Sequence, residues 1–571
     1  MLKTENIFTF NHLKTLVMLN KTIVDFFEES ILNNWELPAI SDYNGITYSY
    51  GEVADKIAEL HLFFEKSGVK QGEKIALIGK NSANWGVIFL AVVTYGAVAV
   101  PILPDFKPKD VHYIVTHSES KMLFAADHIF KTLDVEEMPK LKAALLIESF
   151  SLVYSKLKKI SGAFDDLKKN KTKKYPEGVD KSNFRVNKVA FEDLASIIYT
   201  SGTTGFSKGV MLNHRSLASN VQFARDNMPL KHGDNIVSFL PGAHAYGLAF
   251  EFLFPFSLGC HVTFLTKTPS PQIITKAFKE MKPSLILSVP LVIEKIYKKK
   301  IKPEIEKPLI SFLLKVPGLK KVIHKKVLES LNEGFGNNFA EVVIGGAALN
   351  EEIERFFKEI GFKFTVGYGM TECGPLISYA PWNEFRIGSC GRPVDRLEVK
   401  IDSSDPQTEV GEILVKGDNV MVGYYKNEEI TKQTIDADGW LHTGDLGVMD
   451  EDGFIYIKGR SKNLILGPSG QNIYPEEIES LLNARGYVAE SVVIEKNGRL
   501  YGLVFPDYEL MKQNDVDESE LSKILDKYLK QINEQLPSYM RLAKIIIHKE
   551  EFEKTPKKSI KRFLYQDVKV D

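Results

Sequence analysis

The sequence predicts an α/β protein with a large N-terminal domain of parallel α/β sheets that includes a small β-rich subdomain, followed by a small α+β C-terminal domain. Three observations support this prediction. The chain has 571 residues, which is longer than a domain with a single hydrophobic core usually is. Its first half alternates β-rich runs with helical patterns, which favours parallel sheets. From about Arg392 the apolar runs become shorter and turns become more frequent.

The alternation of helix and strand begins near residue 50, where Gly51–Ser67 has a helical pattern. Short apolar runs of strand length follow, at Lys74–Gly79, Ala99–Leu103, Lys121–Ala126 and Ala143–Ile147. The pattern then resumes at Ile236–Leu240, His261–Leu265, Leu285–Val289 and Glu341–Ile344. Strands spaced in this way by helices are typical of βαβ units.

Residues 81–104 carry no charge and approach the length of a membrane span. Gly96 and Pro101 interrupt the stretch. We therefore expect a helix to about Tyr95, a turn at Gly96, and a buried strand at Ala97–Leu103.

Two lysine-rich segments lie outside the alternation. Residues 165–185 contain five lysines between Lys168 and Lys174, followed by Pro176 and Gly178, and we expect a solvated, mobile connection there. Within residues 296–332, apolar residues recur at helical spacing from Leu319 to Leu331 with lysines between them. This pattern predicts a basic amphipathic helix that either packs its apolar face inward or lies on an anionic membrane.

The domain boundaries follow from these changes in pattern. We expect an N-terminal domain over residues 1–461, with the β-rich subdomain at about 392–461. Residues 462–571 form the C-terminal domain, whose size is normal for a small folding unit.

Composition limits the partners and the compartment. The net charge is −1, which predicts no nucleic-acid partner. The three cysteines, Cys260, Cys373 and Cys390, cannot form a disulfide framework, and no two have metal-ligand spacing. We therefore expect a cytoplasmic protein, with peripheral contact at the inner face of the membrane as a further possibility.

The segment 197–210, IIYTSGTTGFSKGV, contains the most informative residues. A β-type run leads into a loop whose backbone N–H groups can form an anion-binding concavity. Its hydroxyl groups and glycines are those of Thr200, Ser201, Gly202, Thr203, Thr204 and Gly205. Lys208 can reach a polyphosphate as a point charge. The order of residues differs from that of the common phosphate loop, which requires Gly-Lys-Ser/Thr.

YTSGTTGFSKG resembles the phosphate loop of the adenylate-forming superfamily, whose members activate a carboxylate with ATP and pass the acyl group to a thiol. Four further segments are similar to family motifs and occur in the family's order. They are Leu240–Gly247, Gly345–Ala348, Val366–Glu372 and Gly439–Asp445. The resemblance covers nearly the whole chain and is strongest with long-chain fatty acyl-CoA synthetases.

The resemblance implies roles for individual residues toward ATP and Mg²⁺. The purine edge would be approached by Gly345, Gly346 and Ala347, and the adenine face would stack on Tyr368 between Gly367 and Gly369. Thr371 would contact the α-phosphate or the carboxylate, and Glu372 with Thr200 would hold Mg²⁺, a cation that prefers oxygen ligands. Asp445 would accept hydrogen bonds from the ribose hydroxyls.

The resemblance also implies residues for the acyl group and for domain movement. His244 would orient the acyl carboxylate, and its imidazole titrates near neutral pH. Arg460 would contact the ribose or a phosphate. Lys462 would be the hinge about which a mobile C-terminal domain rotates. Residues Tyr474–Glu479 would line the tunnel for the thiol.

One departure from the family pattern concerns the lysine that contacts the α-phosphate near the C-terminus. Counting from Thr555 puts Ser559 at the family's lysine position. We assign the role to the neighbouring Lys558, and Lys557 or Lys561 could take it instead.

The expected activity is ATP-dependent conversion of a fatty acid, long-chain by resemblance, to an acyl adenylate. The acyl group then passes to coenzyme A, giving acyl-CoA, AMP and pyrophosphate. ATP, Mg²⁺ and coenzyme A as co-substrate are therefore the expected cofactors. The phosphopantetheine of an acyl carrier protein could replace coenzyme A as the acceptor. The sequence is also compatible with a ligase for aryl acids and with an inactive binding protein that keeps the fold.

Overall fold

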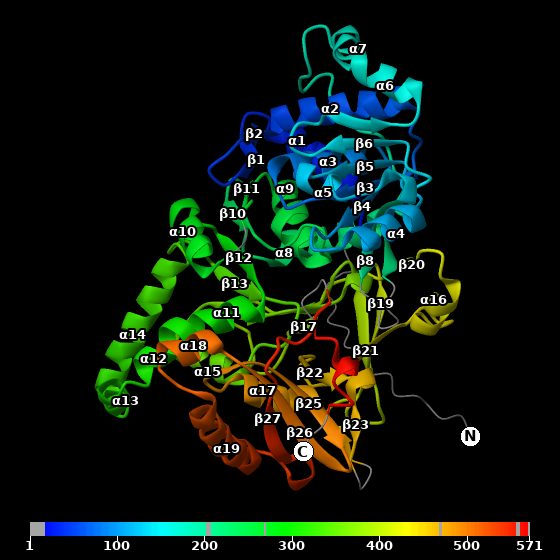
Figure 1. Cartoon of the computed structure of the whole chain (residues 1–571). Helices are drawn as coiled ribbons and strands as arrows, with labels where there is room; N and C mark the ends of the chain where they lie inside the picture. The colour runs from blue at the N-terminus through cyan, green and yellow to red at the C-terminus, as the bar shows by residue number, and fades with distance from the viewer. Residues whose placement is uncertain (1–17, 201–206, 268–269, 468–470, 556–559, 569–571) are drawn as a thin grey trace, which may run out of the picture.

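The computed structural model describes residues 18–200, 207–267, 270–467, 471–555 and 560–568 (Figure 1). It is an α/β structure with seven sheets among these residues. The largest sheet has eight strands in the order β20-β9-β8-β4-β3-β5-β6-β7. Its strands are β3 Lys74–Ile78, β4 Val98–Ile102, β5 Met122–Ala125, β6 Ala143–Leu146, β7 Leu152–Ser155, β8 Leu194–Thr200, β9 Lys208–Asn213 and β20 Gly423–Tyr424. The central strands run parallel, and β7, β9 and β20 pair antiparallel at the two edges.

Two smaller sheets of the N-terminal part are largely parallel. One has the order β10-β11-β1-β2, with β10 Asn235–Ser238, β11 His261–Phe264, β1 Pro38–Asp42 and β2 Thr47–Ser49. The other consists of β12 Leu285–Ser288, β13 Glu341–Ile344 and β14 Phe364–Val366. Helices that cover these sheets include α1 Ile23–Asn33, α2 Tyr50–Ser67, α8 His214–Asn227, α10 Pro271–Met281 and α15 Glu351–Ile360.

The uncharged stretch 81–104 divides as predicted into helix α3, Ala83–Thr94, and strand β4. All residues of both elements are buried, which explains why the stretch carries no charge. Within the described part of the chain, no helix is both long and apolar enough to cross a membrane.

The prediction of a simple solvated connection over residues 165–185 is wrong for its first half. The structure has helices α6, Lys158–Asp165, and α7, Leu167–Lys174. Lys171 on α7 forms ion pairs of 2.7 Å with Asp55 and Glu59 on α2. The helix is thus anchored by contacts with a part of the chain more than 100 residues away.

Between residues 368 and 460 the strands pair antiparallel. A short sheet contains β15 Tyr368–Gly369, β16 Leu376–Tyr379 and β17 Arg392–Pro393. A four-stranded sheet follows with β18 Leu397–Asp402, β19 Gly411–Gly417, β21 Leu441–Met449 and β22 Ile455–Arg460.

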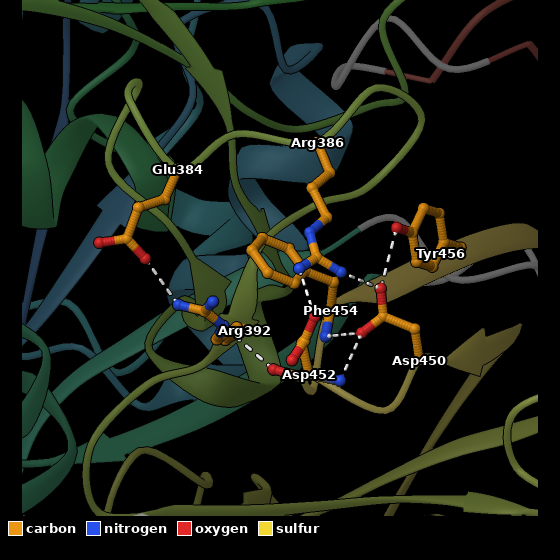
Figure 2. Close-up of polar contacts among 7 residues, drawn as sticks. All are labelled: Glu384, Arg386, Arg392, Asp450, Asp452, Phe454 and Tyr456. Carbon is orange, nitrogen blue, oxygen red and sulfur yellow. Dashed lines mark hydrogen bonds and ion pairs between the residues drawn. The ribbon is translucent and has the colours of Figure 1, made fainter.

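Two arginines connect the segment before β17 with the turn between β21 and β22 (Figure 2). Arg386 pairs with Asp450 at 2.7 Å and also with Asp452, and Arg392 donates to the Asp452 carbonyl at 3.0 Å. Both guanidinium groups lie over the Phe454 ring, about 4 Å from its centroid. These contacts fix the four-stranded sheet against the rest of the N-terminal part.

The C-terminal part has its own hydrophobic clusters. Its main sheet is β25 Val488–Lys496, β26 Arg499–Pro506 and β27 Leu542–Ile547, with helices α17 Pro475–Asn483 and α19 Glu518–Gln535 beside it. Contacts with the N-terminal part include a 2.8 Å hydrogen bond from Asn350 Nδ2 to the Ser480 carbonyl and one of 3.0 Å from Lys302 Nζ to the Ala484 carbonyl.

Candidate active site

Three of the sequence-predicted nucleotide segments follow the ends of parallel strands, the usual place for ligands in α/β folds. β8 ends at Thr200, β13 leads into Gly345, and β14 leads into Gly367. The last two ends are adjacent, since the Gly367 amide donates to the Ile344 carbonyl at 2.9 Å. Five predicted loop residues, Ser201, Gly202, Thr203, Thr204 and Gly205, lie outside the described residues.

Two predicted glycines are required by close contacts. A Cβ on Gly345 would lie only 3.1 Å from the ring of Tyr246, whose hydroxyl donates to the Val343 carbonyl at 3.0 Å. A Cβ on Gly369 would collide with the carbonyl of Pro375. Gly346 adopts φ +89°, a backbone conformation that favours glycine, and Ala347 follows it. Gly345 and Gly369 therefore allow neighbouring protein segments to pack closely at these strand ends.

Asp445 is the most enclosed carboxylate among the predicted nucleotide residues, with 4% of its surface exposed. Tyr368 donates its hydroxyl to Oδ2 at 2.7 Å, and Arg460 Nε contacts Oδ1 at 2.8 Å. Burial raises the pKa of Asp445, while Arg460 and the Tyr368 hydroxyl oppose this shift. Each carboxylate oxygen thus has one protein partner and further lone pairs available as acceptors.

Glu372 and Lys208 lie at one side of this cluster. Tyr424 donates its hydroxyl to Glu372 Oε1 at 2.9 Å, and the Lys208 ammonium lies 5.0 Å from the centroid of the Tyr424 ring. Burial lowers the pKa of Lys208, the nearby Lys462 ammonium lowers it further, and Glu372 raises it. Lys208 pairs with Thr200 across strands β8 and β9.

This neighbourhood fits the predicted magnesium site by its chemistry. It offers a hydroxyl from Thr200 and a carboxylate from Glu372, both oxygen ligands. Mg²⁺ typically takes one or two carboxylates and completes its shell with phosphate oxygens and water. Among the described residues there is no cluster of three or more His, Cys, Asp or Glu side chains that could hold a metal on its own. A cation here would therefore need a phosphate ligand to complete its shell.

His244 follows a turn that buried polar groups hold in place. Asn81 Oδ1 accepts from the Gly242 amide at 2.7 Å, and its amide nitrogen donates to the Leu240 carbonyl at 2.6 Å. Glu251 Oε2 accepts from the amides of Phe239 and Leu240 at 2.9 and 2.8 Å. Sequence reasoning missed Asn81 and Glu251, because no motif includes these contacts.

Glu251 is fully buried, and burial raises the pKa of its carboxyl well above the usual range. It also accepts a 3.0 Å hydrogen bond from the Ser238 hydroxyl. The carboxyl lies within the π-helical turn Gly247–Leu253, which follows the His244 loop in the chain. Its position indicates that it shapes this loop and does not contact a ligand.

The predicted C-terminal residues are only partly described. Lys462 is exposed in a short turn at Ser461–Asn463, next to Arg460. Lys557, Lys558 and Ser559 lie outside the described residues. Lys561 pairs with Glu553 at 3.2 Å. Thr371 is buried in the turn Thr371–Cys373 beside Glu372.

Glu479, assigned by resemblance to the thiol tunnel, is buried and forms an ion pair with Arg562. Burial raises its pKa to about 7 although Arg562 opposes the shift. Its Oε1 also accepts from the Val493 amide at 2.6 Å. In this arrangement Glu479 fastens the end of the chain to α17 and β25.

The fold, the enclosed Asp445 carboxylate with its Arg460 partner, and Glu372 with the nearby Lys208 are those expected for the class of adenylate-forming enzymes. Comparison with known proteins agrees with this class. Residues 27–425 match the family described as AMP-binding enzyme, and residues 462–567 match the AMP-binding enzyme C-terminal domain. The chain belongs to the AMP-binding enzyme family.

Similar proteins include the long-chain-fatty-acid–CoA ligase FadD15 of Mycobacterium bovis, which is 29% identical over 78% of this chain and 74% of that protein. The chloroplastic long-chain-fatty-acid–[acyl-carrier-protein] ligase AEE15 of Arabidopsis thaliana is 28% identical over 83% and 74%. Among solved structures, the anthranilate CoA ligase AuaEII in complex with anthranoyl-AMP has a TM-score of 0.77 and 20% identity, covering 96% of this chain and 97% of that one. These findings confirm the predicted family and fold.

Proposed function

We propose that the protein is an AMP-forming ligase that activates long-chain fatty acids and transfers them to coenzyme A. The observation that supports this most directly is the cluster of Asp445, Tyr368 and Glu372 at the strand ends of a fold shared with adenylate-forming enzymes. In the first step, a carboxylate oxygen of the acid attacks the α-phosphorus of ATP and pyrophosphate leaves. In the second, a thiolate attacks the acyl carbonyl, and AMP leaves with the electrons of the broken bond.

Within this proposal the chain's own residues bind, orient and neutralise charge. Asp445 accepts from the two vicinal ribose hydroxyls with its free lone pairs, and Tyr368 lies against the adenine. Lys208 lies where it can contact the polyphosphate. Such transfers depend mainly on positioning and on stabilising the charge that develops on the phosphoryl oxygens. Mg²⁺ held by Thr200 and Glu372 would supply further neutralisation of phosphate charge.

An apolar cavity supports a fatty acid as the carboxylate substrate. Its volume is about 270 Å³, close to the lower end of typical ligand pockets. The apolar residues that line it are Phe239, Ile274, Phe278, Val292, Ile296, Ile301, Val327, Leu331 and Phe335. Most of them come from α10, α11 Pro290–Ile296, the π-helical turn Tyr297–Ile301 and α14 Pro317–Gly334, while Phe239 directly follows β10 and Phe335 directly follows α14.

The inner end of this cavity lies beside the nucleotide cluster. Ser288 and Phe239 are buried and line it. The Ser288 carbonyl accepts from the Gly345 amide at 3.0 Å. An acyl chain in the cavity would therefore extend away from the strand ends where its carboxylate reacts.

Coenzyme A is the acceptor we favour, with an acyl carrier protein as the second candidate. Rotation of the C-terminal domain about Lys462 would bring the thiol acceptor to the acyl adenylate after the first step, as domain movements do in other enzymes. The carrier protein remains a candidate because a lysine-rich segment around α14 could contact an acidic protein.

Acid-dependent ATP–pyrophosphate exchange across saturated acids of increasing chain length tests the substrate. We expect a long-chain optimum for the unchanged protein. Val292→Trp, which fills the cavity, should move the optimum to shorter acids and leave exchange with a short acid intact. Leu291→Trp is the matched control, because Leu291 is 49% exposed and does not line the cavity. An optimum that Val292→Trp leaves in place would contradict the assignment of this cavity.

A further inference from the structure

The segment from Lys307 to Leu328 has an unusual charge pattern. It contains six lysines and no acidic residue, whereas the whole chain has nearly equal numbers of both. It spans helix α13, Pro308–Leu313, and the first two-thirds of α14. Lys315 and Lys321 form no ion pair with any described residue, and Lys325 only a long one of 3.9 Å with Glu329. The segment therefore presents a net positive surface.

The same two helices expose large apolar side chains. Five of them are between 40% and 67% exposed, namely Leu309, Phe312, Val316, Leu319 and Val322. Isolated exposed apolar residues are common, but five within fourteen positions of one segment form a continuous apolar feature. In Figure 1 this segment forms the far end of an arm, α12 to α14, that extends from the molecule beside α10.

The apolar stripe predicted for this helix is therefore divided between two faces of α14. Val327, Leu328 and Leu331 pack against the core, as expected for a surface helix. Leu319 and Val322 instead face solvent. One face of the helix is thus packed against the core, while apolar side chains remain exposed among lysines on another part of its surface. This composition is typical of a helix that lies at a membrane interface.

The acyl cavity opens next to this surface. Its lining runs from the buried Phe239 and Ser288 to the exposed Lys300, Glu304 and Lys326. Lys326 belongs to α14, so the opening and the lysine-rich surface share a helix. A ligand that enters the cavity from this side passes α14, the helix that also carries the exposed Leu319 and Val322.

We propose that the arm formed by α13 and the first half of α14 docks the protein on an anionic lipid membrane, with its apolar side chains in the headgroup region. The lysines contact lipid phosphates, each contributing roughly fivefold to the partition coefficient. A bilayer fits better than an acidic protein because exposed apolar side chains and lysines occur together within the segment from Lys307 to Leu328, and such mixed surfaces insert at an interface. The inference goes beyond the proposed function, and only its corollary, that acyl chains enter the cavity from the bilayer, depends on that function.

Co-sedimentation with vesicles tests the docking without ATP, acid or coenzyme A, so its outcome does not depend on the activity. The vesicles are phosphatidylcholine alone and an equal mixture of phosphatidylcholine and phosphatidylglycerol. We expect salt-sensitive binding to the mixture only. Lys315→Gln with Lys321→Gln and Lys325→Gln should reduce the partition coefficient on the order of 100-fold.

The control and a second variant separate charge from insertion. Helix α7, all of which the structure describes, carries exposed lysines but no exposed large apolar side chain. Lys168→Gln with Lys169→Gln and Lys173→Gln should therefore leave binding nearly unchanged. Leu309→Ser with Phe312→Ser should reduce binding even at low salt.

Three outcomes would overturn the proposal. The first is that the protein binds equally to both vesicle types. The second is that the α7 control variant and the arm lysine variant lose vesicle binding to the same extent. The third is that the arm variants bind vesicles as well as the unchanged protein does. In the last case, loss of transfer to an acidic carrier protein in the same variants would assign the surface to a protein partner.

Discussion

Replacement of the enclosed carboxylate, Asp445→Asn, tests the proposed ribose contact. The substitution keeps the size of the side chain and one acceptor oxygen for Tyr368, which donates to Oδ2 at 2.7 Å. It removes the negative charge that would accept from the ribose hydroxyls. A hydrogen bond to a charged group contributes about 1.5–3 kcal/mol, so a loss of about 2 kcal/mol corresponds to roughly 30-fold in the KM for ATP.

The assay compares ATP with 2′-deoxy-ATP and 3′-deoxy-ATP in acid-dependent pyrophosphate exchange. The unchanged protein should discriminate against both analogues, and Asp445→Asn should lose most of this discrimination, because the two changes remove the same interaction. The lost ion pair with Arg460 has a small effect on folding, since the arginine side chain is 58% exposed and solvent screens the pair.

Asp436→Asn is the matched control. Asp436 lies shortly before β21 and accepts from the Trp440 amide at 2.9 Å, away from Tyr368 and Arg460. We expect it to leave the KM for ATP and the discrimination unchanged. Ribose discrimination that persists in Asp445→Asn, with a normal unfolding temperature, would refute the assignment.

Three further predictions follow from buried polar contacts. Tyr424→Phe removes the hydrogen-bond donor to Glu372 Oε1. It should raise the Mg²⁺ concentration needed for half-maximal pyrophosphate exchange roughly 10-fold. An unchanged Mg²⁺ requirement would contradict the assignment of Glu372 as a ligand of the cation. Glu251→Ala leaves buried donors unpaired and should cost about 3 kcal/mol in denaturant unfolding, whereas Glu251→Gln, which keeps an acceptor oxygen for them, should cost much less. Burial raises the pKa of Glu341 from 4.5 to about 7, so its contribution to stability is complete below about pH 4.5 and is lost as the pH rises to about 7. Between pH 4.5 and pH 7, the unfolding free energy of Glu341→Gln should therefore fall by about 3 kcal/mol less than that of the unchanged protein. The same fall in both proteins would contradict a raised pKa of Glu341.

Local patterns in the sequence were sufficient to predict many strands of the N-terminal sheets, but not β1, β2, β7 and β9. The strand β3 and the division of residues 81–104 into α3 and β4 follow from uninterrupted apolar runs and from a glycine at the turn. Helix α7 could not be predicted in this way, because a run of lysines has no apolar periodicity. It is held instead by ion pairs between Lys171 and helix α2.

The candidate site was predictable where residues belong to a contiguous motif. Asp445, Tyr368 and Glu372 were found on that basis, and the structure brings Asp445 and Tyr368 into direct contact. Tyr424 and Asn81 were missed because their contacts join segments far apart in sequence. The cavity proposed for the acyl chain was inaccessible to sequence reasoning for the same reason, since Phe239 after β10, Ser288 of β12 and several helical elements together form its wall.

The central claim is that this chain activates a fatty acid through an adenylate and passes it to coenzyme A. The most direct measurement is AMP release from ATP with palmitate, with and without coenzyme A, over a panel of acids. The account predicts AMP release that depends on coenzyme A and is greatest with long-chain acids. Absence of both AMP and pyrophosphate with every acid, from a folded protein that binds ATP, would contradict it.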